Sequence, residues 1–188
     1  MPALNSMILW TIYLSFIKVG SYFFSFQWDI LLLEVGFISI FLLSWQLFVT
    51  PKNAKEPSRL VLFVAKLLLF RFMLTSGLVK LASNDQLWWS LKALNVHYET
   101  QPLPHLVSWY VHNLPEFFHV LSCLLMFIIE LFVPFLFFLS NRIRSFAAFS
   151  TILLMAVIIA TGNYGFFNFL VIVMCLLLID DSYFKKIR

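Results

Sequence analysis

Long apolar runs, separated by short polar stretches, dominate the pattern along this chain. A helix needs about 20 mainly apolar residues to cross about 30 Å of hydrocarbon. None of the runs alternates between apolar and polar residues, which favours helices over the strands of a membrane barrel. The pattern predicts an all-α polytopic membrane bundle of about five to six transmembrane helices. Six stretches reach or approach the required length: 3–17, 30–49, 60–81, 117–139, 146–159 and 166–179.

Composition narrows the class of protein further. Of the 188 residues, 62% are hydrophobic and 12% are charged, whereas soluble domains are about 45 to 50% apolar and about 25% charged. This excludes a water-soluble enzyme. The 13 Lys and Arg residues are spread between apolar runs and form no basic patch, so we expect no nucleic-acid partner. The lipid bilayer is the first partner that the sequence predicts.

The basic residues predict the orientation in the membrane. Because cytoplasmic loops carry the excess of Lys and Arg, the side with more basic residues is the cytoplasmic one. Eight lie in the connections at 52–59 and 142–144 and in the tail, against three in the other connections. We therefore predict a membrane domain over 1–181 with both ends in the cytoplasm, a lumenal loop at 82–116, and a basic cytoplasmic tail at 182–188.

Four ionisable residues lie inside the apolar runs: Glu34, Lys66, Arg71 and Glu130. A charge near the bilayer centre costs about 3 kcal/mol or more unless it is paired or reaches water. Counting about 1.5 Å per residue from the ends of the runs places Lys66 level with Glu130, and Arg71 near Glu34. We predict an intramembrane polar network of these two ion pairs. A proton or ligand site built from the same residues is the alternative.

Pro134 lies four residues after Glu130 in the same apolar run. Because proline has no N–H, the Glu130 carbonyl loses its helical donor, and we predict a kink. The freed carbonyl beside an acidic side chain would form a polar pocket at membrane depth. A tilted packing helix with a salt bridge is the simpler interpretation.

The residue types that bind metals or act as nucleophiles do not occur in this sequence with the spacing that such sites need. The four histidines, at 97, 105, 112 and 119, are seven or eight residues apart. Seven residues span about 10.5 Å along a helix, whereas metal bonds are about 2 Å long. Nucleophile, Walker and dinucleotide motifs are absent from the sequence. We therefore predict no catalytic, metal-binding or cofactor-binding residues, and expect that the chain is not an enzyme.

The connection at 82–116 has its own pattern. Trp88 and Trp89 stand next to a predicted membrane end and are typical of an amphipathic segment at the interface. The proline-rich part that follows is expected to be extended, because residues before proline avoid the helical region. The loop either binds a soluble partner or only caps the bundle.

Several polar and aromatic blocks occur in a fixed order from about Ser21 to Asp181. They are Ser25-Phe26-Gln27-Trp28-Asp29 with Glu34, Phe70-Arg71-Phe72-Met73, Gly77-Leu78-Val79-Lys80, His97-Tyr98-Glu99-Thr100-Gln101-Pro102-Leu103-Pro104, and Thr161-Gly162-Asn163-Tyr164 through Phe166-Phe167-Asn168 to Asp180-Asp181. Together these blocks resemble the lipase maturation factor family, and the glycine-asparagine-tyrosine block is nearer the second branch of that family.

The resemblance implies a multi-pass protein of the endoplasmic reticulum membrane that assists the folding and assembly of secreted dimeric lipases, without a catalytic centre. A lumenal client such as a lipase is then the expected partner. The candidate client-contact residues are His97, Tyr98, Glu99, Gln101 and Pro102. The further family-matching polar positions are Gln27, Trp28, Asp29, Asn163 and Asn168.

Family members continue into a large C-terminal region, so the sequence represents either a fragment or a reduced protein. That region is expected to be lumenal, whereas the charge count places Asp181 on the cytoplasmic side, which leaves five or six crossings open. The terminal Lys185-Lys186-Ile187-Arg188 is similar to a dilysine retrieval signal, or is the basic cluster that follows a last span.

Two other functions stay open from the sequence. Charged residues at membrane depth are also typical of a small transporter or proton-coupled permease. A more distant similarity between the helical module of the family and that of vitamin K-dependent carboxylases implies a membrane enzyme with a quinone-like cofactor.

Overall fold

The computed structural model describes residues 1–49, 56–101 and 105–180. Within these residues the regular structure is helical and contains no strand, as the predicted all-α class requires. The chain divides into two compact units, residues 1–68 and 69–188, and each is described by itself. Helix α3 (Arg59–Ala82) begins in the first unit and ends in the second.

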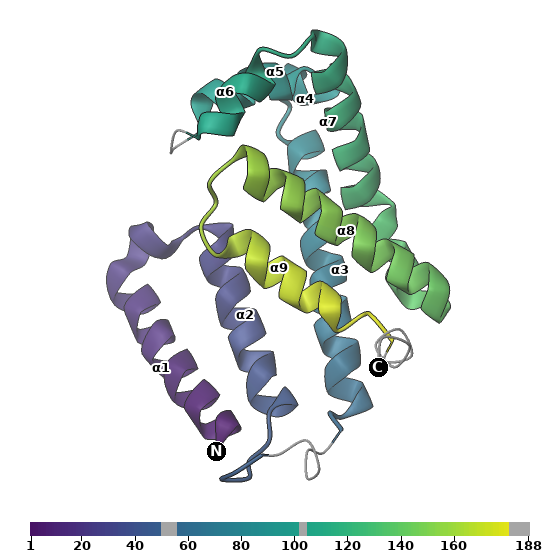
Figure 1. Ribbon diagram of the computed structural model, residues 1–188. Coiled ribbons are helices and arrows are strands. Elements are labelled where there is room, and N and C mark those ends of the chain that lie inside the picture. The colour runs from purple at the N-terminus through teal and green to yellow at the C-terminus, as the bar shows by residue number, and fades with distance from the viewer. Residues whose placement is uncertain (50–55, 102–104, 181–188) are drawn as a thin grey trace. The chain divides into compact units, whose positions relative to one another are not determined.

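The first unit contains an antiparallel pair formed by α1 (Pro2–Gly20) and α2 (Gln27–Leu42), which a short 3₁₀ helix, η1 (Ser21–Phe24), connects. The two helices lie side by side (Figure 1). Trp10 Nε1 donates to the carbonyl oxygen of Leu33 at 3.0 Å, and the Tyr13 hydroxyl donates to Asp29 Oδ1 at 2.5 Å. Trp10 and Tyr13 of α1 are thus satisfied by groups of α2.

The second unit is built on α7 (Glu116–Leu131), whose residues Cys123, Met126 and Phe127 form a buried apolar cluster. Three short helices precede it: α4 (Gln86–Trp89), α5 (Ala93–Thr100) and α6 (Leu106–His112). Helix α5 packs on α7, and α6 packs on α5. We call this segment, residues 83–101 and 105–115, the cap. Its side chains packed on the cluster are Trp88, Leu91 and Leu94. Figure 1 shows the cap gathered at the α7 end that begins at Glu116.

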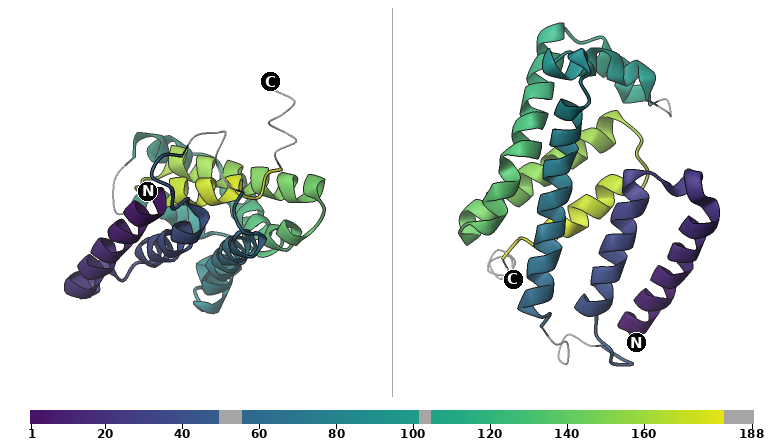
Figure 2. Two further views of the ribbon diagram at one scale, coloured as in Figure 1. Left: turned by 90° about the horizontal axis from the view of Figure 1, so that it is seen from below. Right: turned by 180° about the vertical axis from the view of Figure 1, so that it is seen from behind.

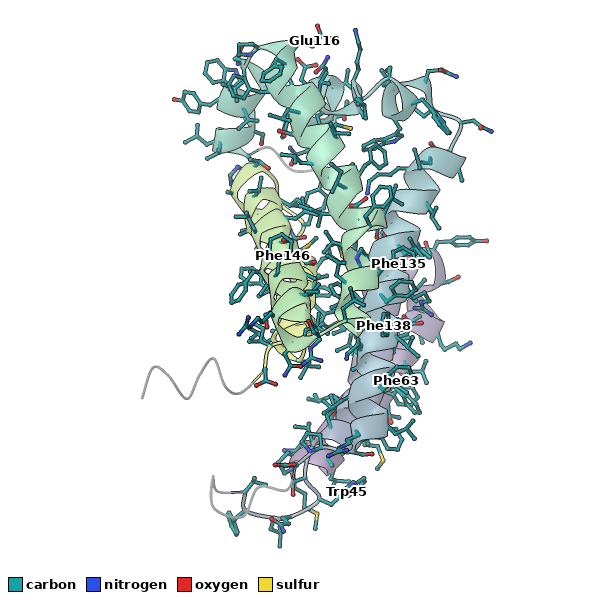
Figure 3. All side chains as sticks on the ribbon, turned by 90° about the vertical axis from the view of Figure 1, so that its right-hand side faces the viewer. Trp45, Phe63, Glu116, Phe135, Phe138 and Phe146 are labelled. Atoms are coloured by element: carbon teal, nitrogen blue, oxygen red, sulfur yellow. The ribbon has the colours of Figure 1, made fainter. Side chains whose placement is uncertain are left out.

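The predicted kink at Pro134 is confirmed. Helix α7 ends at Leu131, and the chain continues as a 3₁₀ helix, η2 (Val133–Phe138), with Pro134 at its start. Proline tolerates this first turn because its missing N–H is not needed there. Phe135 and Phe138 of η2 both pack edge-on against Phe70 of α3, with ring centroids 5.2 and 5.4 Å away (Figure 3).

Helices α8 (Asn141–Thr161) and α9 (Phe167–Leu176) form an antiparallel pair (Figure 2). Helix α8 of this pair packs on η2. The end of α9 returns to the start of α8. There Arg144 Nε donates to the carbonyl oxygen of Leu178 at 2.8 Å, and Asn141 Nδ2 donates to Asp180 Oδ2 at 2.7 Å. The chain therefore leaves this pair at the end of the bundle where it entered.

Four of the described helical segments are long and apolar enough to cross a membrane: Pro2–Phe24, Arg59–Ala82, Glu116–Phe138 and Asn141–Thr161. Together with α2 and α9 they account for all six predicted stretches. The predicted bounds 30–49 and 146–159 were wrong. Helix α2 ends at Leu42, and α8 begins five residues earlier than predicted because it includes the basic residues Arg142 and Arg144 in its first turn.

Candidate functional site

A buried ion pair joins the end of α3 to the end of α7. Lys80 Nζ lies 2.7 and 2.6 Å from the two carboxylate oxygens of Glu130 and 3.1 Å from the carbonyl oxygen of Ser76. It also lies 5.7 Å above the ring of Trp88 in the cap. Glu130 is only 5% exposed. A carboxylate at this depth needs such a cation, because an unpaired buried charge costs several kcal/mol.

This pair corrects the sequence prediction, which gave Glu130 the partner Lys66. The actual partner, Lys80, lies 14 residues further along α3, about 21 Å at the helical rise. The depth count failed because it placed the neighbouring ends of the two runs, residues 81 and 117, at the same level. Because Lys80 is two residues from the end of α3 and Glu130 is 14 residues from the start of α7, α7 continues about 18 Å beyond α3. Figure 3 shows Glu116 well beyond the end of the blue helix α3.

Gly77, one turn before Lys80, lets the two helices approach. A β-carbon at this position would lie 2.6 Å from Leu131 Cδ2 and 3.2 Å from Glu130 Cβ. Small residues allow this close approach between helices in membranes. The sequence therefore places glycine where the α7 backbone must come near enough for Glu130 to reach Lys80.

His97 of α5 anchors the cap to the connection between α8 and α9. Its Nε2 shares a hydrogen bond with the Tyr164 hydroxyl at 2.8 Å, and the two rings are nearly parallel. Burial lowers the pKa of His97 below its ordinary value of 6.5, and the nearby charge of Lys80 lowers the pKa further. His97 is therefore neutral at pH 7 and can accept the hydrogen of Tyr164.

A second series of contacts connects α5 with α6 and α7. The ring of Tyr98 packs on His119, with centroids 5.8 Å apart, and His119 Nε2 donates to the carbonyl oxygen of His112 at 3.3 Å. His112 Nε2 in turn lies 2.7 Å from Glu99 Oε1. Three of the four histidines thus make contacts that hold the cap together.

Gln101, just after α5, fixes the cap to the end of α8. Its Nε2 donates to the carbonyl oxygen of Thr161 at 3.2 Å. Gly162 permits this contact, since a β-carbon there would lie 2.8 Å from Gln101 Oε1 and 2.8 Å from the Tyr164 ring. Thr161, Gly162 and Tyr164 therefore form the surface against which His97 and Gln101 pack.

The structure gives the predicted client-contact stretch mostly internal contacts. His97, Tyr98 and Gln101 are partly buried and face other parts of the protein, whereas Glu99 is exposed. Pro102 lies outside the described residues. The sequence predicted contact with a client for this stretch and missed its internal partner Tyr164, which lies 67 residues away along the chain. The spacing of polar residues gave no signal for that contact.

The other predicted residues have varied surroundings. Asp29 is buried and paired with Tyr13, and Trp28 stacks on Phe26 with ring centroids 4.6 Å apart. Asn163 accepts a hydrogen bond from the Gly165 amide at 3.4 Å. Gln27 lies exposed at the start of α2, and Asn168 is buried in α9. The pair of Arg71, on α3, with Glu34, on α2, stays a prediction.

Replacing Tyr164 with Phe tests the His97 anchor. We expect a loss of about 1 to 2 kcal/mol of stability, because His97 Nε2 loses its partner in a partly buried site. Thermal unfolding of the purified protein in detergent measures the change. Tyr110→Phe is the matched control, since that side chain is 61% exposed. Equal stability of the two variants would contradict the anchor.

The lowered pKa of His97 predicts acid sensitivity of the cap. A group whose folded pKa is depressed stabilises the fold fully above its unfolded pKa, and this contribution is lost as the pH falls through the folded pKa. We expect the thermal midpoint to decrease as the pH falls from about 7 to 5. His97→Phe should reduce the slope of this decrease. An unchanged slope would assign the acid sensitivity to other groups.

Metal ligation has no geometric support in the described part of the chain, where His, Cys, Asp and Glu nowhere gather in groups of three that could hold an ion. What the site offers is a set of buried polar contacts between the cap, α3, α7 and the connection from α8 to α9. Contacts of this kind hold the cap in a fixed position.

Comparison with known proteins shows the family of the chain. A family described as "Lipase maturation factor transmembrane domain" matches residues 2–186. Lipase maturation factor 2 of Xenopus laevis is 43% identical over 183 residues, which cover 94% of this chain and 25% of the relative. The human protein of the same name is 42% identical over 94% of this chain and 26% of its own length.

The other branch of the family is similar to nearly the same degree. Human lipase maturation factor 1 is 41% identical over 175 residues, 93% of this chain and 30% of the relative. No solved structure matches the chain significantly. The chain spans about a quarter of the length of the lipase maturation factor 2 relatives. With nearly all of its residues matched to the transmembrane domain and with apolar helices long enough to cross a bilayer, this chain is a multi-pass membrane protein that belongs to the lipase maturation factor family.

Proposed function

We propose that this chain is the membrane module of a factor in the endoplasmic reticulum that assists the folding, assembly or maturation of secreted proteins such as homodimeric lipases. The observation that carries the proposal is the match of 94% of the chain to proteins named for lipase maturation. The relatives are named as factors, which favours a chaperone-like role over catalysis. The lipase client belongs to this proposal, because the chain spans only part of the length of those relatives.

The internal contacts suggest how the module works. His97, Tyr98 and Gln101 hold α5 against Tyr164, His119 and Thr161. In this proposal they position the cap and do not touch the client. The exposed residues of α5, which are Val96, Glu99 and Thr100, remain for contact with a client. Loops positioned by a rigid scaffold commonly carry such contacts.

The proposed topology keeps the cap on the lumenal side and the basic connections in the cytoplasm. The contacts of Asn141 with Asp180 and of Arg144 with Leu178 support this arrangement. They bring the end of α9 back to the basic start of α8, so that Asp180 lies on the side of Arg144. Endoplasmic reticulum location and the lipase client follow from the family proposal.

A chimera tests the proposed function. The matching transmembrane quarter of a full-length lipase maturation factor 2 is replaced by this chain, and the chimera is expressed together with a homodimeric lipase in cells that lack the endogenous factor. We expect restored secretion of active lipase, measured as activity per amount of lipase protein. The factor without the matching quarter is the negative control. A chimera that inserts into the membrane but leaves secreted lipase inactive would contradict the proposal.

A further inference from the structure

The connection between α1 and α2 exposes several aromatic rings. Tyr22 and Phe23 of η1 are 89% and 84% exposed, and Phe26, which follows, is 49% exposed. No residue from Val19 to Trp28 carries a charge. We call residues 21–26 the η1 turn, and Figure 1 shows it at the end of α1 opposite to the N-terminus. Three aromatic side chains within five residues are therefore presented to the surroundings of this helix pair.

Local contacts fix the η1 turn on α1. A β-carbon at Gly20 would overlap the ring of Phe24, so glycine lets this ring fold back on the helix. Phe24 also packs edge-on against Tyr13 of α1, with ring centroids 6.3 Å apart. Ser25 Oγ donates to the carbonyl oxygen of Tyr22 at 3.0 Å, which satisfies a backbone group of the turn. The turn is thus held in one position, and its two most exposed rings extend away from it.

The exposed side of α1 leads directly to the η1 turn. Apolar residues at helical spacing, three or four positions apart, are exposed along this side: Leu9, Ile12, Phe16 and Val19. Phe23 of the η1 turn comes four residues after Val19. Because α1 and η1 together form one of the candidate membrane spans, Pro2–Phe24, this side of the helix meets the acyl chains of lipids. The η1 turn therefore continues a lipid-facing surface.

A second group of exposed apolar residues follows α2. Trp45, Leu47 and Phe48 are 54%, 69% and 83% exposed. Ala3 N donates to the carbonyl oxygen of Ser44 at 3.2 Å, which places this 43–49 segment beside the start of α1. The segment and the η1 turn therefore lie at opposite ends of α1. The 19 residues of α1 are about 29 Å long, and the hydrocarbon region is about 30 Å thick.

Basic residues occur next to both groups. Lys18 is exposed and lies one turn before Tyr22, about 6 Å along the helix. Its long side chain can extend to the lipid phosphates, as lysines near the ends of membrane helices do. After the 43–49 segment the sequence continues with Lys52, Lys55 and Arg59. The charge near each aromatic group thus complements the phosphates of lipid headgroups.

We propose that the η1 turn and the 43–49 segment are two membrane anchors, which lie in the headgroup regions of opposite leaflets and fix the level of α1 and α2 in the bilayer. Tyr22 and Trp45 suit these positions, because amphipathic aromatic rings favour the membrane interface. The 16 residues of α2, about 24 Å long, fit between the two anchors. The exposed Phe37 and Phe41 of α2 then lie in the hydrocarbon, as the exposed side of α1 does.

Fluorescent probes on single added cysteines test this inference with the full chain in phosphatidylcholine vesicles. Tyr22→Cys and Phe23→Cys report on the η1 turn, and Phe48→Cys reports on the 43–49 segment. Ile12→Cys, near the middle of α1, is the control inside the hydrocarbon. Glu56→Cys, on an exposed residue of the polar connection before α3, is the aqueous control.

Three quenchers are compared: a doxyl group near the lipid headgroup, a doxyl group near the end of the acyl chain, and iodide on both sides of the vesicle. The native Cys123 and Cys175 are buried, and the unsubstituted protein measures their background. The probes at positions 22 and 23 are measured separately, so that one replaces the other if a variant unfolds at a lower temperature than the unsubstituted protein.

We expect the shallow doxyl group to quench the probes at Tyr22, Phe23 and Phe48 several-fold more than the deep one, and the probe at Ile12 to show the reverse. Iodide should quench mainly the probe at Glu56. Anchor probes that iodide quenches as strongly as the probe at Glu56 face water, and anchor probes that no quencher reaches are covered by protein. Either result, or stronger quenching by the deep doxyl group, overturns the inference. The readout uses no lipase, so its failure is distinct from failure of the proposed function.

Discussion

Replacing Lys80 with Met is expected to lower the free energy of unfolding by about 3 kcal/mol. The substitution keeps most of the apolar stem but leaves the carboxylate of Glu130, which is 5% exposed, without its cation. Removing one partner of a buried ion pair costs about 3 to 5 kcal/mol, because the remaining charge is desolvated and unpaired. Thermal unfolding in detergent and the yield of monodisperse protein measure the effect.

Lys92→Met is the matched control for this experiment. Its partner Glu116 is also a carboxylate of α7, but both side chains are more than half exposed, 53% and 57%. Exposed pairs contribute little, so no measurable change is expected. The double variant Lys80→Met with Glu130→Met should recover most of the lost stability, since no buried charge remains. A Lys80→Met protein as stable as Lys92→Met would contradict the buried pair.

Replacing Gly77 with Ala is expected to destabilise the protein by about 1 to 3 kcal/mol, the usual cost of overpacking. The new methyl group would lie 2.6 and 2.9 Å from two carbons of Leu131, and α7 must move away or Leu131 must change rotamer. Alanine is the better helix former by about 1 kcal/mol. A net loss of stability would therefore show that the cost of the steric contact exceeds this gain in helix propensity. Thermal unfolding measures it.

Gly36→Ala in α2 separates packing from propensity. A β-carbon there would meet only Trp10 Cδ1, at 3.2 Å. Both substitutions gain the same helix propensity, and Gly36→Ala is expected to be neutral or stabilising. If both variants gain stability, α3 and α7 do not approach at Gly77 as described.

The sequence predicted the helices well because crossing a membrane constrains their length and composition. The kink at Pro134 and the need of Glu130 for a cation were also predictable, since each follows from one residue and its environment. The partner of Glu130, Lys80, was not predictable from depth alone. Nothing in the apolar pattern shows that the cap lies beside α7 and shifts α7 by about 18 Å relative to α3.

The candidate site shows the same limit. The stretch from His97 to Gln101 stood out in the sequence as polar and aromatic, and a client-contact role was predicted for it. Its side chains His97 and Gln101 meet Tyr164 and Thr161, which lie 67 and 60 residues away, and the client-contact role stays a prediction. Such contacts depend on the fold of the whole unit. Gly77 and Gly162 were visible only as members of family-matching blocks, and their role follows from the close approach of Leu131 and Gln101.

The central claim is that buried polar contacts position the cap through which this membrane module acts. The most direct measurement is lipase maturation by the chimera that carries this chain, compared between Lys80→Met, Lys92→Met and the charge-reversed pair Lys80→Glu with Glu130→Lys. Secreted lipase activity is expressed per amount of membrane-inserted chimera. We predict that Lys80→Met loses most of the activity, that Lys92→Met keeps it, and that the reversed pair regains part of it. Full activity of the Lys80→Met chimera at equal membrane levels would contradict the claim.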